Sequence, residues 1–399
     1  MRINRNTLPL LRGRWNFVRT FVAAGLAAAL FAPAVRAQDK PAPDVVVFKN
    51  GDQLTGTLER GAGDSIVFKS DAVGEVTIPM DKVKELRSGS SFVVLKKDEK
   101  ITSTPKEPVH LAVEDGAVKE SSSNGATQTV ASKDVAYIVD GATYNKELNG
   151  HPGFFKGWDG SATGGITILQ STSYGQTYTA GLSLIRAIPT VAYLPPRSRT
   201  TFNLLETYGK LTQPTVPQTN PATPDAVAKT NIFHTDFEHD KYFSSQFYML
   251  GNLMFDHNYS QGLNFQQIYG VGAGYTVFSN PVHQLDVKAD VHYERQNFIQ
   301  YDDPTLLSTP NQDLIGSTFA ENYRRLLPGK IALTESGTFI QSWNNTDAWS
   351  AIGGLGLALP VYHRLSLSVN FLDNYLNNPP IGYKKNSLQY VTGVTYTFH

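Results

Sequence analysis

Residues 386–398, NSLQYVTGVTYTF, alternate between large apolar and small polar side chains. One parity holds Leu388, Tyr390, Val394, Tyr396 and Phe398, and the other holds Gln389, Gly393, Thr395 and Thr397. Because successive side chains of a strand point to opposite faces, this pattern predicts a strand with one apolar and one polar face. Such a strand leaves a row of unpaired backbone groups unless it pairs on both sides. The feature therefore favours a closed barrel, and in hydrocarbon closure is required because every backbone polar group has to be paired.

Eleven further segments beyond residue 154 show a similar amphipathic pattern and are expected to be strands. With the terminal segment, the expected strands are 155–168, 175–187, 199–210, 229–243, 245–257, 264–278, 282–298, 313–327, 330–342, 347–361, 364–373 and 386–398. Most reach about nine residues or more, the length that a tilted strand needs to cross hydrocarbon. Short and long connections alternate, as in outer-membrane barrels, except for a long link, PTVAYLPPRSR, where a short one is expected. The sequence predicts an all-β chain in which 155–399 form an antiparallel up-and-down transmembrane β-barrel of about 12 strands, with 10 strands as the alternative.

The strand expected at 313–327 is ambiguous in its parity. Glu321 shares its parity with Phe319 and Tyr323, so a carboxylate falls on the face that is otherwise apolar. The segments 199–210 and 330–342 are also mixed. Alternation alone therefore assigns the faces of these three strands less clearly than the others.

Residues 1–37 have the features of a secretory signal peptide. Arginines precede the apolar run FVAAGLAAALF, and Val35-Arg36-Ala37 gives a small-x-small cleavage pattern. An N-terminal membrane anchor is the alternative. We expect the mature chain to be exported to the outer membrane of a Gram-negative cell, with its N-terminal domain in the periplasm. The net charge of zero argues against nucleic-acid binding, and the absence of cysteine excludes thiolate chemistry and disulfides.

Residues 44–140 read as a separate periplasmic β-domain of short strands. The Asn50-Gly51 pair is a strong hairpin signal because both turn positions favour positive φ. A second, looser copy of this pattern from Phe92 to Val139, with turns at Asp115-Gly116 and Asn124-Gly125, would make the domain a tandem. The first copy resembles the Sm-like β-modules of bacterial envelope proteins. The matching residues are Lys49-Asn50-Gly51-Asp52, Leu54, Gly56, Gly74-Glu75-Val76 and Asp81-Lys82-Val83.

The barrel half resembles the domain of unknown function 481 (DUF481) family, often labelled salt-induced outer-membrane proteins. The likeness runs from Trp158-Asp159-Gly160 to Phe398, and its best blocks are 247–256 (FYMLGNLMFD), 269–275 (YGVGAGY), 378–382 (NPPIG) with Lys384-Lys385, and 392–398 (TGVTYTF). The resemblance implies an outer-membrane location and no established activity. Barrels of this kind usually end on the aromatic residue, whereas His399 follows Phe398 here.

Two strands carry closely spaced polar residues that we expect to face the barrel lumen. They are His234, Asp236, Glu238 and Asp240 on one strand, and Asp286, Lys288, Asp290, His292 and Glu294 on another. Ligands of this type and spacing bind divalent cations, but polar side chains are also typical of any barrel interior. We therefore interpret them as lumen-facing residues and predict no metal site, no catalytic residue and no cofactor.

Other constellations give weaker signals. No G-x-S-x-G motif is present, and the His363, Ser366 and Ser368 group falls near an expected turn. The repeated Gly270, Gly272 and Gly274 precede no helix, so close packing inside a barrel explains them better than a dinucleotide loop does.

The predicted function is a porin-like structural role, or passage or binding of small solutes in the cell envelope. The expected partners are outer-membrane lipid, the barrel-assembly machinery and a periplasmic protein that contacts the N-terminal domain, without nucleic acid. Two alternatives remain at this point. One is a barrel enzyme acting on envelope lipid or glycan, and the other is a soluble periplasmic ligand-binding β-protein.

Overall fold

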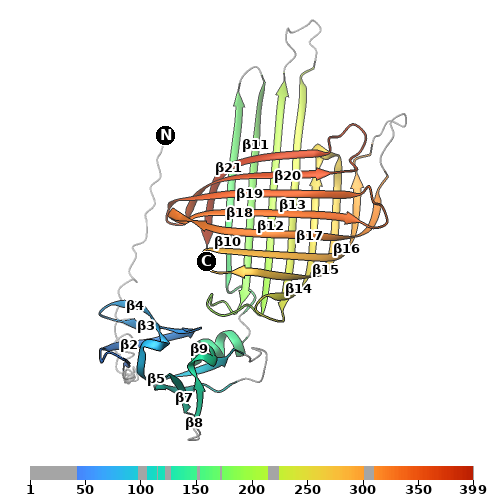
Figure 1. Ribbon diagram of the computed structural model, residues 1–399. Coiled ribbons are helices and arrows are strands. Elements are labelled where there is room, and N and C mark those ends of the chain that lie inside the picture. The colour runs from blue at the N-terminus through green and yellow to red at the C-terminus, as the bar shows by residue number, and fades with distance from the viewer. Residues whose placement is uncertain are drawn as a thin grey trace, which may run out of the picture.

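The computed structural model describes residues 43–97, 106–114, 116–121, 127–150, 153–170, 173–213, 224–300 and 310–398. The expected signal segment 1–37 and the terminal His399 lie outside these residues. Two all-β regions follow one another along the chain, and Figure 1 shows the N-terminal sheet beside one end of a barrel. Among the described helices, none has the length and apolarity needed to cross a membrane.

The N-terminal region is a curled antiparallel sheet. Its elements are β1 (Asp44–Phe48), β2 (Gln53–Ala62), β3 (Ser65–Ser70), β4 (Gly74–Pro79), η1 (Met80–Lys82), β5 (Val83–Lys96), β6 (Val109–Glu114), β7 (Ala117–Ser121), β8 (Thr127–Ala131), η2 (Ser132–Asp134), β9 (Val135–Asp140), α2 (Gly141–Thr143) and η3 (Tyr144–Asn149). The strand order is β4-β3-β2-β1-β5-β6-β7-β8, and β9 pairs with both β2 and β5. This second pairing of β9 bends the sheet so that one face encloses a core.

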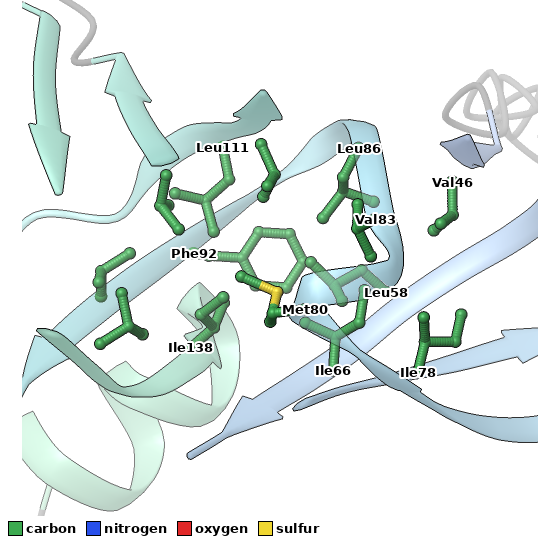
Figure 2. Packing of buried hydrophobic residues seen from close by; sticks show 14 of the residues in the cluster. Val46, Leu58, Ile66, Ile78, Met80, Val83, Leu86, Phe92, Leu111 and Ile138 are labelled. Atoms are coloured by element: carbon green, nitrogen blue, oxygen red, sulfur yellow. The ribbon is translucent and has the colours of Figure 1, made fainter. Parts of the chain in front are cut away.

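Apolar side chains fill that core (Figure 2). Phe92 lies at its centre and is fully buried, and Leu58, Ile66 and Leu86 around it are at most 1% exposed. At the start of β1, the buried carboxylate of Asp44 accepts hydrogen bonds from the Leu58 amide at 2.7 Å and from the Ser88 hydroxyl at 2.6 Å. The region is therefore organised like a soluble domain, with its apolar residues inside.

The same succession of elements occurs twice in this region. Three strands, a short 3-10 helix and a closing strand run from β2 to β5 and again from β6 to β9. Both 3-10 helices begin and end on extended residues, and each leads directly into the strand that follows. β5 pairs with β6 along 85–87 and 91–92 and with β9 along 92–96, whereas β1 pairs with β2 and β5.

The second region is a closed antiparallel barrel of twelve strands. They are β10 (Trp158–Gln170), β11 (Tyr174–Ile188), β12 (Ser198–Gln213), β13 (Ala226–Tyr242), β14 (Phe247–Asn258), β15 (Leu263–Ser279), β16 (His283–Phe298), β17 (Gln312–Leu327), β18 (Ile331–Ser342), β19 (Trp349–Tyr362), β20 (Leu365–Leu376) and β21 (Asn386–Phe398). The terminal strand β21 closes the barrel by pairing with β10, for example Val394 with Gly164. The predicted fold class is confirmed, and twelve strands replace the alternative of ten.

The two faces of the barrel strands differ as the alternation predicts. Large apolar side chains point outward and are exposed, among them Val271 (64%), Leu367 (53%) and Leu388 (69%). The intervening side chains point inward, and on β16 they are polar and mostly buried. Glu321, whose strand is ambiguous in sequence, pairs with Val287 and therefore points outward, because directly paired residues share a face.

The two ends of the barrel are built differently. The end of the barrel beside the N-terminal sheet, called the near end, carries the link 189–197 and the short links 243–246, 280–282, 328–330 and 363–364. The opposite end, called the far end, carries η4 (Tyr259–Gln261) and the links 343–348 and 377–385. At the far end, Gln261 donates to the backbone oxygens of Asn374 and Lys385 at 2.9 and 2.6 Å. Leu263, Phe298 and Leu376 pack together beside it. These contacts connect η4 and the start of β15 to the ends of β16 and β20.

The near-end link 189–197, which is unexpectedly long, contacts the N-terminal region. Leu194 packs into an apolar cluster whose other buried members are Val93, Leu95, Val139, Tyr144 and Leu148. The Glu147 carboxylate accepts hydrogen bonds from both the amide and the hydroxyl of Thr190, each at 2.8 Å. The Arg197 guanidinium donates to the Leu148 oxygen at 2.8 Å. The length of this link is thus explained by its role in joining the two regions.

Candidate lumen site

All nine polar residues predicted from sequence occupy inward positions, on β13 and β16. Strands β14 and β15 separate these two strands, yet their side chains meet. Gly270, Gly272 and Gly274 of β15 make this approach feasible. A Cβ at Gly272 would lie 2.1 Å from the Ala289 oxygen, and one at Gly274 would lie 2.2 Å from the Tyr248 ring. The glycines therefore serve close packing inside the barrel.

Toward the near end of the lumen, Arg199 of β12 connects the polar side chains of β13 and β16. Its guanidinium donates to Asp240 at 2.7 Å and to Asp286 at 3.1 Å. It also lies over the rings of Tyr242 and Tyr248, at 5.8 and 5.1 Å from their centroids. Since β12 and β16 are four strands apart, this fork crosses part of the lumen.

A second connection lies further along the same strands. The Lys288 ammonium donates to Glu238 at 2.6 Å, and the Asn252 amide donates to Asp290 at 2.8 Å. These bonds link β16 to β13 and β14 through the interior. Paired charges of this kind hold side chains in fixed positions in a site with little water.

Two histidines occupy the far half of the lumen. His234 has carboxylates on both ring nitrogens, Asp256 on Nδ1 at 2.6 Å and Asp236 on Nε2 at 3.1 Å. His292 has Asp290 on Nδ1 at 2.8 Å, whereas its Nε2 has no hydrogen-bond partner. Glu294 accepts hydrogen bonds from the amide groups of Gln266 and Gln296.

The opposite wall carries mostly small or neutral residues, with Arg324 as a cation near one end. On β17 and β18 the inward Asn322, Arg324 and Thr334 are exposed near the near end, whereas Ile340 and Ser342 are buried toward the far end. Solvent thus reaches this wall from the near end. A cavity of about 70 Å³ lies in the far half, with polar His234, Asp256 and Gln266 among its lining residues and apolar Ile340, Ile352 and Leu372 among the others.

Sequence reasoning missed the residues that connect the two polar strands. Arg199, Asn203 and Asp256 are members of the network, and none was singled out. Alternation gave the face of each but no indication of which strands meet across the lumen. Within the described ranges, no three His, Asp or Glu side chains are placed together so as to hold a metal ion.

The weaker catalytic constellation does not assemble among the described residues. His363 lies in the turn between β19 and β20 with a positive φ of 43° and stacks edge-on against Tyr362. Ser368 accepts a hydrogen bond from Thr395 on β21. The site that the barrel does build is a lumen network of carboxylates with a few cations and two imidazoles.

Several solved barrels are similar to this chain at low identity. The NanC porin has 6% sequence identity and a TM-score of 0.36, with 60% of this chain and 100% of that chain covered. The translocator domain of the autotransporter NalP from Neisseria meningitidis has 13% identity and a TM-score of 0.31, with 60% and 87% covered. The COG4313 outer membrane channel from Pseudomonas putida F1 has 12% identity and a TM-score of 0.30, with 60% and 95% covered. Likeness at this level carries no argument about function.

Among curated proteins, none matches the chain. A family model does match: the one described as "Protein of unknown function, DUF481" covers residues 191–398, which is more than half of the chain and includes ten of the twelve barrel strands, β12 to β21. The chain belongs to the DUF481 family of proteins of unknown function.

Proposed function

We propose that this protein is an outer-membrane β-barrel whose lumen binds and passes small polar solutes, cations in preference to anions. The observation that carries the proposal is the reversal of polarity across the barrel wall. Exposed apolar side chains such as Val271 and Leu388 cover the outside, while Asp286, Asp290 and Glu294 are buried inside. A soluble ligand-binding barrel would turn its apolar face inward, so this arrangement favours a lipid environment over the soluble alternative.

The preference for cations follows from the charges on the inward face of β12 to β17. Seven carboxylates occupy these positions: Asp236, Glu238, Asp240, Asp256, Asp286, Asp290 and Glu294. The permanent cations are Arg199, Lys288 and Arg324. Rings and walls of carboxylates make a lumen attractive to cations.

The role we propose is non-catalytic. The charged side chains of the lumen pair with one another, as Arg199 does with Asp240 and Asp286, and we assign them to solute binding. The N-terminal sheet would lie on the periplasmic side, where it could contact a periplasmic protein.

The outer-membrane location and the cation preference of the lumen can both be tested on the full-length protein. It should stay with outer membranes after carbonate extraction, and its migration on gels should change on boiling. In planar lipid bilayers under a potassium chloride gradient, the reversal potential should have the sign of a cation-preferring pathway. Recovery in the soluble periplasm would overturn the membrane assignment. A reversal potential of the opposite sign would overturn the cation preference.

A further inference from the structure

We infer that the far half of the lumen binds a divalent transition-metal cation through His292 Nε2 and Glu294 Oε2. The inference rests on the proposed function in one respect, since it names a solute class for the same lumen. It is carried by four observations on the side chains of β16 and the strands beside it.

The first observation is the orientation of His292. Its Nδ1 lies 2.8 Å from Asp290 Oδ1 and 3.2 Å from Thr318 Oγ1. An ionised carboxylate can only accept, so Nδ1 carries a proton, and Nε2 is the ring nitrogen left to bind a metal ion. Metal-binding histidines are oriented in the same way, with a carboxylate on the nitrogen that does not bind the metal.

The second observation is that Nε2 is buried and has no hydrogen-bond partner. The His292 side chain is 0% exposed. A buried ring nitrogen of this kind normally has a partner, because an unmade hydrogen bond costs free energy. His234 of the same lumen has carboxylates on both of its nitrogens.

The third observation is what lies opposite Nε2. Glu294 Oε2 is 3.9 Å away, and the Glu294 side chain is 1% exposed. The other oxygen, Oε1, accepts from both the Gln266 and the Gln296 amides. His292 Nε2 and Glu294 Oε2 thus face each other at a separation that a cation between them would bridge after a small adjustment.

The fourth observation concerns the surroundings of the ring. Gly316 pairs with His292, and a Cβ at Gly316 would lie 3.0 Å from Nε2, so a larger residue would crowd the metal-binding nitrogen. Gly316 also pairs with Ser342, whose buried hydroxyl oxygen has no hydrogen-bond partner. The buried Gln296 Oε1 is unpartnered as well. The strands beside His292 thus carry two further buried oxygens without a hydrogen-bond partner.

The charges favour a cation over a neutral guest. Asp236, Asp256, Asp290 and Glu294 place four carboxylates around the two histidines of the far half. Imidazole with oxygen ligands suits zinc, cobalt and nickel better than calcium or magnesium. With only two charged or imidazole ligands, the site should bind and release its ion reversibly, as conduction requires.

The test uses the full-length protein purified in detergent and stripped of metal with EDTA. Cobalt(II) is added and followed by its visible absorption, and zinc(II) binding is measured by calorimetry. We expect about one ion per chain, with ligand-field bands showing nitrogen and oxygen coordination. His292→Gln and Glu294→Gln should each abolish binding. Asp290→Asn should weaken it by about 10- to 100-fold, because the ring loses its orienting carboxylate.

His234→Gln is the matched control, because it removes a lumen histidine whose two nitrogens are both paired. It should leave cobalt binding unchanged. Heat-dependent gel migration checks that each variant is folded. If His292→Gln does not fold, the isosteric Glu294→Gln tests the site in its place. Absence of binding to the unmodified protein, or equal loss in His234→Gln, would overturn the site. Cation-preferring conductance without cobalt binding would leave the proposed function intact, and cobalt binding without conductance would leave the site intact.

Discussion

The N-terminal sheet and the barrel are both built from strands of alternating polarity, yet they bury opposite faces. Phe92 in the sheet is fully buried, whereas Phe319 in the barrel is 57% exposed. Asp290 in the barrel is buried, with hydrogen bonds from Asn252, Thr318 and His292. The difference teaches that alternation predicts a strand but does not say which face is inside. The length of the strands and the polarity of the face opposite the apolar one indicate which face is inside.

The largest effect should come from the apolar core of the N-terminal sheet. Phe92→Ala should lower the free energy of unfolding of this region by about 3–5 kcal/mol, because a cavity is left among closely packed neighbours. Denaturant unfolding followed by circular dichroism would measure the loss. Phe319→Ala is the control on the barrel exterior, where no protein core closes around the ring, and its effect should be clearly smaller. Similar losses in both variants would mean that the two regions bury the same face.

The barrel half of the comparison is tested by placing one charge on each face of the same pair of strands. Val287→Arg puts a cation on the outer face of β16 and should cost about 2–4 kcal/mol if the position lies near the bilayer midplane. Asn322→Arg puts the same charge on the inner face of β17, opposite Asp286 in register, and should be tolerated. Refolding into lipid vesicles, scored by heat-dependent gel migration, measures both. Equal damage would contradict the assignment of the faces.

Much of the barrel could be predicted from sequence because its physical constraint is local. The expected strand 386–398 matches β21 in the structure, and the others differ by a few residues at their ends. The inward polar residues were recognisable because Asp286 to Glu294 alternate with apolar residues without interruption. Which of them meet was not predictable, since the contact of Arg199 with Asp286 depends on the curvature of the closed wall.

The contact between the two regions was also beyond sequence reasoning. The long link 189–197 stood out by its length alone, and nothing in its composition indicated that Leu194 packs against Leu148. The same holds for Glu147, which lies in the short helical segment η3 after β9. Contacts between distant segments depend on how complete domains fit together, which local patterns do not encode.

A smaller effect is expected where the sheet and the barrel join. Leu194→Ala should weaken docking by about 2 kcal/mol, at the low end for a buried leucine, because Leu194 is the buried member of the apolar cluster that the link contributes. Limited proteolysis should cut the α2–η3 segment faster in the variant. Ala192→Ser in the same link is the control, since Ala192 is exposed. An unchanged rate in Leu194→Ala would indicate that the apolar cluster does not hold the regions together.

The smallest effect is a pH dependence of the same junction, carried by Glu147. Burial of this carboxylate acts to raise its pKa, and the hydrogen bonds from Thr190 together with Lys146 outweigh burial and leave the pKa below the ordinary value of 4.5. A depressed folded-state pKa means that the contribution of Glu147 to docking is complete above 4.5 and is lost as the pH falls through the lower value.

Hydrogen-exchange protection of the Thr190 amide should therefore be constant from neutral pH down to about pH 5, and should then decline on further acidification. Glu147→Gln should lower the protection at neutral pH and remove the decline, since an amide does not titrate in this range. Thr190→Val removes one of the two donors while keeping the backbone amide, so it should retain a decline of smaller amplitude. An acid-induced loss of protection that is the same in Glu147→Gln as in the unmodified protein would show that other groups control the junction. In that case the N-terminal sheet would be held to the barrel by the apolar contacts around Leu194 and by the hydrogen bond from Arg197 to the Leu148 oxygen.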